Sequence, residues 1–150
     1  VMCLCEVAAW CKKNGITVWD QMLKLYEKYG YFKETQYAIT LKGIDGSRQI
    51  AEMMDKLRSN PPKTFGELTV KEFRDYDKDI TRNLATGEET PTGLPKSNVL
   101  YFDLTNDSWC WARPSGTEPK IKFYMGVKGS SLEDAQDKVE KLTEALKSYL

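Results

Sequence analysis

The alternation of apolar and polar residues along this chain predicts a β-sheet in its second half. The clearest run covers residues 120–128, where every second side chain is apolar, as in a strand with one buried face. Shorter or less regular runs predict further strands over residues 31–42, 65–76, 98–105 and 108–113. In the last of these, Trp109, Trp111 and Arg113 share one face. Short turns separate the later strands and favour antiparallel pairing.

Apolar residues at helical spacing predict two helices that flank these strands, over residues 43–58 and 130–149. Consecutive prolines end the first helix, and Ser130 with Glu133 forms a capping box that opens the second. From residue 31 the order is strand, helix, four strands, helix. This order predicts an α+β fold, with a mainly antiparallel sheet and two helices packed on one face. The other face of the sheet, or its edge, is left for a ligand.

A hydrophobic segment precedes this unit. Residues 1–11 carry one charge, Glu6, and apolar side chains occupy nearly every side of the helix that they predict. A helix that is apolar all round is buried on most sides, so we expect an upstream part of a longer protein to cover it. The alternative is an ordinary core helix at the start of a domain. Thr17 and Asp20 then form a weaker capping box for a second helix, which ends at Gly30.

One long segment lacks any periodic pattern. Residues 79–97 carry Thr, Gly, Pro and acidic residues without alternation, which predicts a loop. A loop of that length is uncommon in a compact domain and is often functional or mobile. We therefore expect no strand or helix within this segment.

Composition and charge exclude several classes of function. Lys and Arg number 22 and so do Asp and Glu, so no basic excess is present to neutralise a nucleic-acid backbone, and we exclude nucleic acid as the main partner. The chain has no histidine, which excludes Ser-His nucleophile pairs and histidine metal ligands. No apolar run approaches the roughly 18 residues that a membrane span needs. No secretory signal is visible either, so we expect a cytoplasmic protein without a membrane partner.

The four cysteines predict packing rather than chemistry. No Cys-x-x-Cys spacing occurs among Cys3, Cys5, Cys11 and Cys110, so a zinc site is not expected. We interpret all four as small apolar packing residues in a reducing compartment.

The residues of the segment Arg113-Pro-Ser-Gly-Thr-Glu-Pro-Lys120 suit a phosphate. The planar guanidinium of Arg113 matches a pair of phosphate oxygens, and the hydroxyls of Ser115 and Thr117 can donate to others. Gly116 is expected to take a positive φ, which would turn successive N–H groups into one concavity. Lys122 on the next strand adds positive charge.

Two points in the same segment leave another interpretation open. A glycine-containing turn between two strands, with an arginine on the surface, is common and needs no ligand. Glu118 also opposes an anion site unless its side chain turns away or pairs with a lysine, because like charges repel.

The runs Leu94-Pro-Lys-Ser-Asn-Val-Leu100 and Arg113-Pro-Ser-Gly-Thr-Glu-Pro-Lys-Ile-Lys-Phe-Tyr124, with Trp109 between them, resemble the C-terminal part of the α-D-phosphohexomutases. Within that superfamily they look most like the bacterial phosphoglucomutase/phosphomannomutase family. The resemblance covers essentially the whole chain. The Arg-x-Ser-Gly-Thr loop is its most specific part.

The resemblance implies two parts of a larger enzyme that interconverts glucose 1-phosphate and glucose 6-phosphate. Residues 1–30 correspond to the helical end of the third, α/β domain. Residues 31–150 correspond to the fourth domain, whose fold is similar to that of the TATA-binding protein and which grips the phosphate that is not transferred. Its phosphate contacts fall on Arg113, Ser115, Gly116, Thr117 and, with less support, Lys122. The phosphoserine donor and the aspartates that hold Mg²⁺ belong to upstream domains.

This chain is therefore expected to bind without catalysing, with no catalytic residue, metal ligand or cofactor of its own. Its expected partners are a phosphorylated hexose, the bisphosphate intermediate and the upstream domains of the same polypeptide. The same resemblance leaves open a phosphomannomutase, a phosphoglucosamine mutase or a phosphopentomutase. A different alternative is a non-catalytic interaction module that uses the apolar N-terminal helix.

Overall fold

A computed structural model describes the backbone of residues 1–150 and every side chain except that of Ile44. Its strands form one 8-stranded sheet in the order β1-β8-β7-β6-β3-β4-β5, with β2 paired to β3, and every pairing is antiparallel. The helices are α1 (Met2–Lys13), α2 (Val18–Tyr29), α3 (Gly43–Ser59) and α4 (Leu132–Tyr149). The strands are β1 (Tyr31–Thr40), β2 (Thr64–Phe65), β3 (Leu68–Asp75), β4 (Ile80–Asn83), β5 (Glu89–Thr90), β6 (Leu100–Leu104), β7 (Trp109–Pro114) and β8 (Lys120–Gly129).

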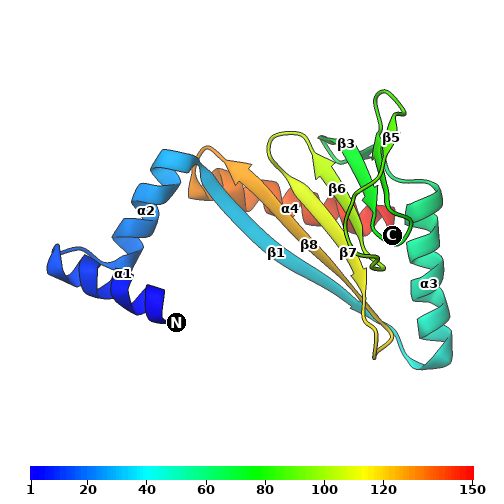
Figure 1. The fold of residues 1–150 in the computed structure, drawn as a ribbon, viewed down its shortest axis with the longest axis horizontal. Helices are drawn as coiled ribbons and strands as arrows, with labels where there is room; N and C mark the ends of the chain where they lie inside the picture. Colours follow the sequence, from blue (N-terminus) through cyan, green and yellow to red (C-terminus); the bar gives the residue numbers. More distant parts are fainter.

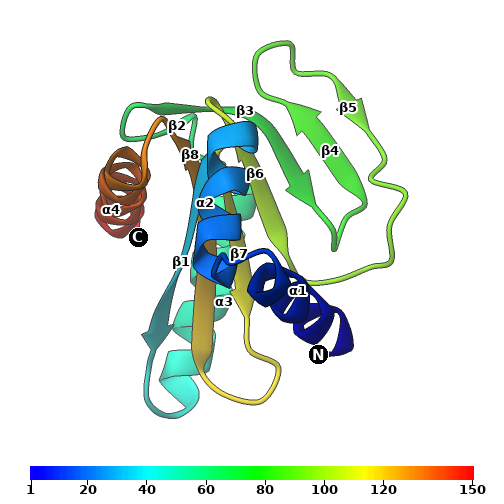
Figure 2. The ribbon, with the colours of Figure 1, turned by 90° about the vertical axis from the view of Figure 1, so that its left-hand side faces the viewer.

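The predicted α+β architecture is confirmed, because α3 and α4 cover one face of the sheet (Figures 1 and 2). Helix α4 runs along β8 and β1, and α3 stands across the end where β7 turns into β8. The alternating apolar residues of β8 point toward these helices and are buried. Each fully buried side chain of this size contributes roughly 1.5–3 kcal/mol. The core joins strand and helix residues, among them Phe102, Ile121, Phe123, Met125, Met54, Leu57, Leu142 and Leu146.

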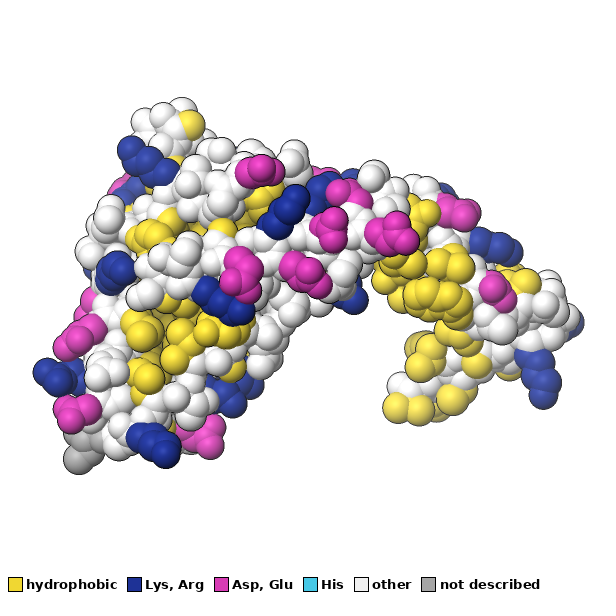
Figure 3. Space-filling view, turned by 180° about the vertical axis from the view of Figure 1, so that it is seen from behind, with side chains coloured by type: hydrophobic (Ala, Val, Ile, Leu, Met, Phe, Trp, Pro, Cys, Tyr) yellow, Lys and Arg dark blue, Asp and Glu magenta, His cyan; other side chains and the backbone are white. Residues whose placement is uncertain are grey.

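Helices α1 and α2 extend away from the sheet (Figure 1). The ring of Tyr26 near the end of α2 stacks on that of Tyr31 at the start of β1, with centroids 5.7 Å apart. The capping box of Thr17 and Asp20 is confirmed, with both reciprocal hydrogen bonds present. Within this chain Cys11 is the buried residue of α1, and apolar side chains gather on the surface of both helices (Figure 3). That an upstream part of a longer protein covers this helix stays a prediction.

The segment expected to be a structureless loop contains a short hairpin of β4 and β5. Two N–H groups, of Ala85 and Thr86, donate to the side-chain oxygen of Asn83 at 2.9 and 3.1 Å and close the turn. Arg82 and Glu89 form an ion pair across the hairpin, with 2.6 Å between Nε and Oε1. The prediction was wrong because β4 is ordered by pairing with β3, a contact that local periodicity does not report.

The start of α4 and the cysteines also need correction. Ser131, not Ser130, caps α4: its hydroxyl accepts from the N–H of Asp134 at 3.1 Å. Asp134 in turn accepts from the N–H of Ser130 at 2.7 Å, so the cap lies one residue later than predicted and the reciprocal bond comes from the residue before it. Cys3 and Cys5 are exposed, so only Cys11 and Cys110 are packing residues. Burial raises the pKa of the Cys110 thiol.

Candidate phosphate-binding site

Strands β7 and β8 place Arg113 and Lys122 directly opposite each other. Their neighbours Ala112 and Phe123 are buried beneath the helices, so the period of two turns both cations to the open face of the sheet. Cβ atoms of directly opposed residues lie about 4.5–5.5 Å apart. The sheet therefore holds two positive side chains close together at the base of the loop.

The loop between β7 and β8 is fixed at both ends by backbone hydrogen bonds. The N–H of Ser115 donates to the carbonyl of Lys120 at 2.7 Å. The N–H of Leu41, just after β1, donates to the carbonyl of Pro119 at 2.9 Å. Among the described residues, no protein acceptor meets the N–H groups of Gly116 and Glu118, which leaves these donors free for a ligand.

The five residues predicted to contact phosphate are brought together. Arg113, Ser115, Gly116, Thr117 and Lys122 line one pocket of about 300 Å³, together with Pro114 and Tyr124. The pocket lies on the open face of the sheet, at the end of β7 and β8. Its polar lining consists of hydrogen-bond donors or hydroxyl groups, and no carboxylate is among them. What this pocket binds stays a prediction.

Glu118 lies on the other side of the loop. It lines a second hollow of about 170 Å³ against α3, with Ser47, Ile50 and Met54 among its neighbours. Glu118 is thus not among the residues that line the pocket of Arg113.

The predicted role of Gly116 in the backbone is wrong. Positive φ angles occur at six other glycines, and Gly116 is not among them. A Cβ atom at Gly116 would meet no heavy atom within 4 Å in the free chain. The absence of a side chain therefore leaves open space above the loop, where a ligand could approach the backbone, rather than relieving a strained turn.

Neither Arg113 nor Lys122 forms an ion pair with any carboxylate that the structure describes. Like charges directly opposite each other destabilise a strand pair. A bound anion would neutralise this repulsion, and a tetrahedral dianion offers enough oxygens for the guanidinium, the hydroxyls and the free N–H groups together. The electrostatics thus favour an anionic ligand in the pocket.

Comparison with known proteins shows what this chain is similar to. No protein-family model matches the chain. Phosphoglucomutases of Staphylococcus aureus strains USA300, NCTC 8325 / PS 47 and COL are each 34% identical to it over 134 residues, which is 89% of this chain and 24% of theirs. The chain belongs to the phosphohexomutase family. It spans about a quarter of the length of these relatives.

A solved structure shows the same fold. The crystal structure of the exocytosis-sensitive phosphoprotein pp63/parafusin, a phosphoglucomutase from Paramecium in an open form, matches with a TM-score of 0.51. The match covers 93% of this chain and 24% of that one, at 14% identity. At this identity the likeness concerns the fold alone.

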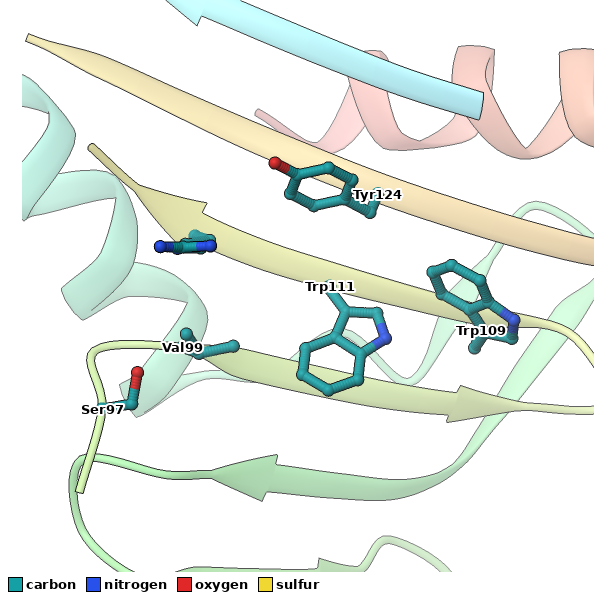
Figure 4. A pocket seen from close by; sticks show the side chains of 6 residues that line it. Ser97, Val99, Trp109, Trp111 and Tyr124 are labelled. Atoms are coloured by element: carbon teal, nitrogen blue, oxygen red, sulfur yellow. The ribbon is translucent and has the colours of Figure 1, made fainter. Parts of the chain in front are cut away.

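An aromatic pocket adjoins the pocket of Arg113 and Lys122 on the open face of this phosphohexomutase sheet. It has a volume of about 530 Å³, and Figure 4 shows the side chains that line it: Ser97, Val99, Trp109, Trp111, Arg113 and Tyr124. Arg113 and Tyr124 line both pockets. The alternation over residues 108–113 predicts one face for Trp109, Trp111 and Arg113, but local sequence patterns assign no binding role to the two tryptophans or Tyr124.

A buried ion pair connects the edge of this aromatic pocket to helix α3. Arg58 donates from Nε to the carboxylate of Asp75 at 2.8 Å, and Asp75 is only 2% exposed. The same guanidinium donates to the side-chain oxygen of Asn98 at 2.8 Å. Asn98 directly precedes Val99, which lines the pocket. Helix α3 therefore fixes the segment that leads into β6.

The structure also bears on membranes and metals. None of the described helices combines the length and the apolar character that crossing a bilayer requires. The described side chains include no cluster of three or more His, Cys, Asp or Glu residues that could hold a metal ion.

Proposed function

We propose that this chain is the C-terminal domain of a phosphoglucomutase and binds the substrate phosphate that is not being transferred. The observation that carries the proposal is the gathering of Arg113, Ser115, Gly116, Thr117 and Lys122 around one pocket without a carboxylate. The relatives that share 34% identity are named phosphoglucomutases, which supports a sugar phosphate as the ligand. The reaction proposed for the whole protein is the interconversion of glucose 1-phosphate and glucose 6-phosphate.

The geometry of the pocket suits the binding of a phosphate that lies away from the reacting end of the substrate. Phosphoryl transfer depends mainly on positioning and on stabilisation of charge. Binding energy from a phosphate that does not react orients the other end of the substrate. Arg113 supplies a bidentate contact, Lys122 a second charge, and the loop supplies hydroxyls and free N–H groups. Such a pocket accepts a phosphate ester at either end of the sugar, as a bisphosphate intermediate that turns over would require.

In this proposal the chemical step takes place elsewhere. The phosphoserine donor and the magnesium ion belong to upstream domains, so the chain alone binds hexose phosphates weakly and turns none over. The whole enzyme is proposed to be cytoplasmic. Mannose, glucosamine and pentose phosphates remain alternative substrates, because the residues that read the sugar hydroxyls are proposed to lie upstream.

Titration followed by backbone amide NMR tests the site. Inorganic phosphate and glucose 1-phosphate are expected to shift the amide signals of residues 113–120, and an Arg113→Ala variant is expected to lose these shifts. Arg82→Ala is the matched control, since Arg82 pairs with Glu89 in the hairpin of β4 and β5. Shifts confined to other regions, or equal in the Arg113→Ala variant, would refute the phosphate grip.

A second candidate function is that of an interaction module, and the exposed apolar surface of α1 and α2 favours it. Trp10 and Trp19 are 52% and 56% exposed, and Met2 and Leu4 are more exposed still. Exposed apolar patches favour association. Sedimentation of the chain with and without residues 1–15 separates the candidates. Loss of self-association with retained phosphate binding supports the phosphate-binding function, whereas a chain that associates but binds no phosphate supports the module.

A further inference from the structure

We infer that the aromatic pocket beside the loop is a subsite for the sugar ring of the bound ester, with Trp111 as its platform. The inference rests on the proposed function, because it places the ring next to a phosphate held by Arg113. It adds that this chain contributes to recognition of the sugar as well as of the phosphate. Three observations carry it: the rigidity of the two indoles, the continuity of the two pockets, and the character of the lining.

Trp111 is held in place before any ligand arrives. Its ring stacks on that of Tyr76 with 5.8 Å between centroids and only 5° between planes. The edge of Tyr101 meets it at 4.8 Å and 62° from the neighbouring strand. Burial raises the pKa of Tyr101, and the carboxylate of Asp103 adds to the effect, so this phenol stays neutral and packs as an aromatic ring. A ring fixed on two sides loses little conformational entropy when a ligand packs on it.

Trp109 is held in place by packing over a glycine of the neighbouring strand. It lies opposite Gly126 in the pairing of β7 and β8. Its indole covers the glycine so closely that a Cβ atom there would lie 2.4 Å from Cε2. The indole therefore occupies the space of the missing side chain and forms a wall of the pocket. Figure 4 shows the two indoles and the phenol of Tyr124 around the same space.

The two pockets form one continuous surface. Tyr124 lies directly opposite Trp111, and Arg113 lies directly opposite Lys122, so the aromatic pair and the cationic pair are neighbours along β7 and β8. Arg113 and Tyr124 line both pockets. A phosphate ester whose anion contacts Arg113 at the loop would therefore carry its ring over Tyr124 toward Trp111.

The lining selects an uncharged ring with both apolar and polar faces. Arg113 is the sole ionic side chain among the described residues that line the pocket, and it is committed to the phosphate. The faces of aromatic rings carry partial negative charge, which attracts the C–H groups on one side of a pyranose. The hydroxyl of Ser97 lies at the rim, where a sugar hydroxyl would need a partner. The volume of about 530 Å³ falls within the range of small-ligand sites.

The indole N–H signals provide a direct test on the whole chain. The chain has 4 tryptophans, and Trp10 and Trp19 on α1 and α2 serve as internal controls. Glucose 1-phosphate is expected to shift the signals of Trp109 and Trp111 and to leave those of Trp10 and Trp19 unchanged. Inorganic phosphate is expected to shift the loop amides but not these indoles. Glucose without phosphate is expected to bind too weakly to shift either set.

A substitution turns the same test into an affinity measurement. In Trp111→Leu, the affinity for glucose 1-phosphate is expected to fall by about 2- to 10-fold while that for inorganic phosphate is unchanged. Trp111→Phe keeps an aromatic face and should retain most of the affinity, which guards against a folding defect in the leucine variant. Trp19→Leu is the matched control and should change neither affinity.

The outcomes separate this inference from the function on which it rests. Phosphate binding at the loop without any preference for the hexose ester, or without indole shifts, overturns the sugar subsite and leaves the phosphate grip intact. Absence of phosphate binding in every arm overturns both. Tighter binding of adenosine 5′-monophosphate than of glucose 1-phosphate assigns the aromatic pocket to a base and overturns the subsite for a sugar.

Discussion

Arg113 and Lys122 oppose each other directly across β7 and β8, on the face of the sheet that the helices leave open. Among the described residues, no carboxylate pairs with either of them. Two cations directly opposite each other destabilise the strand pair unless a bound anion neutralises their repulsion. This arrangement is typical of a site where binding was favoured over the stability of the free chain.

Removing one of these cations is expected to weaken phosphate binding without weakening the fold. Arg113→Ala should cost about 1.5–3 kcal/mol in phosphate affinity, the range for a hydrogen bond to a charged group. The free energy of unfolding should stay equal or rise by up to ~1 kcal/mol, since the repulsion with Lys122 is gone. Calorimetric titration and urea unfolding measure the two quantities. A clear loss of stability would mean that Arg113 holds the sheet together.

Gly116 and Gly126 are expected to respond oppositely to alanine. In Gly116→Ala the new methyl group enters open space, so the melting temperature should stay the same while phosphate affinity falls. In Gly126→Ala the methyl group would overlap the indole of Trp109, at 2.4 Å from Cε2, and overpacking of this kind costs about 1–3 kcal/mol. Thermal unfolding and phosphate titration of both variants check this. Unchanged phosphate affinity in Gly116→Ala would remove the reason proposed for the glycine.

The buried pair of Arg58 and Asp75 is expected to be worth more than any surface pair. Asp75→Ala removes the buried carboxylate from the guanidinium, which is only 12% exposed, and leaves it the exposed carboxylate of Asp55; loss of one partner of a buried pair costs about 3–5 kcal/mol. Asp45→Ala is the control, because Asp45 and Arg48 are 82% and 68% exposed, and such pairs contribute about 0–1 kcal/mol. Urea unfolding midpoints compare the two. Equal shifts would show that α3 is held by its apolar face alone.

Asp134 is expected to make stability depend on pH only in strong acid. A hydrogen bond from Lys138, followed by those from the N–H and hydroxyl of Ser130, lowers the pKa of this carboxyl to about 2. The unfolded chain has an ordinary value near 3.9. The contribution of Asp134 is therefore complete above pH ~4 and is lost as pH falls toward the folded pKa. NMR titration of the folded chain should give a midpoint near pH 2 for the carboxyl of Asp134.

A variant identifies the cause of this shift. Lys138→Ala removes the 2.7 Å contact with the carboxylate and should move the pKa of Asp134 up toward its ordinary value. Lys141→Ala changes a lysine on the same helix that does not contact Asp134, and it should leave the pKa of Asp134 unchanged. Equal titrations in both variants would assign the low pKa to Ser130 alone.

The main elements of the fold could be predicted because their signals are local. The alternation in β8 and the apolar stripe of α4 each report a single buried face, and both elements form as expected. The hairpin of β4 and β5 was missed because its residues are mostly polar, and β4 is ordered by pairing with the preceding strand β3 rather than marked by a periodic pattern of its own. The cover expected for α1 stays a prediction, because apolar composition reports what a helix prefers and not what lies beside it.

The candidate site, like the fold, could be predicted from the sequence only in part. The residue types of the loop were sufficient to propose a phosphate contact at Arg113, Ser115 and Thr117, and they include donors that the structure leaves free. The positive φ expected of Gly116 was wrong, since a glycine can be required by what approaches it as well as by its own backbone. Tyr124 ends the run that resembles the phosphohexomutases, but its place between the two pockets depends on register.

By itself, the sequence determined which faces of its strands and helices are apolar, and it determined that one turn carries an arginine, two hydroxyls and a glycine. Those properties belong to single residues and their nearest neighbours. Only the tertiary structure decided that Lys122 stands opposite Arg113, that Glu118 lies on the far side of the loop, and that Trp109, Trp111 and Tyr124 surround one pocket. Pairing between strands sets these relations, and it is fixed by the burial of the whole core rather than by any one segment.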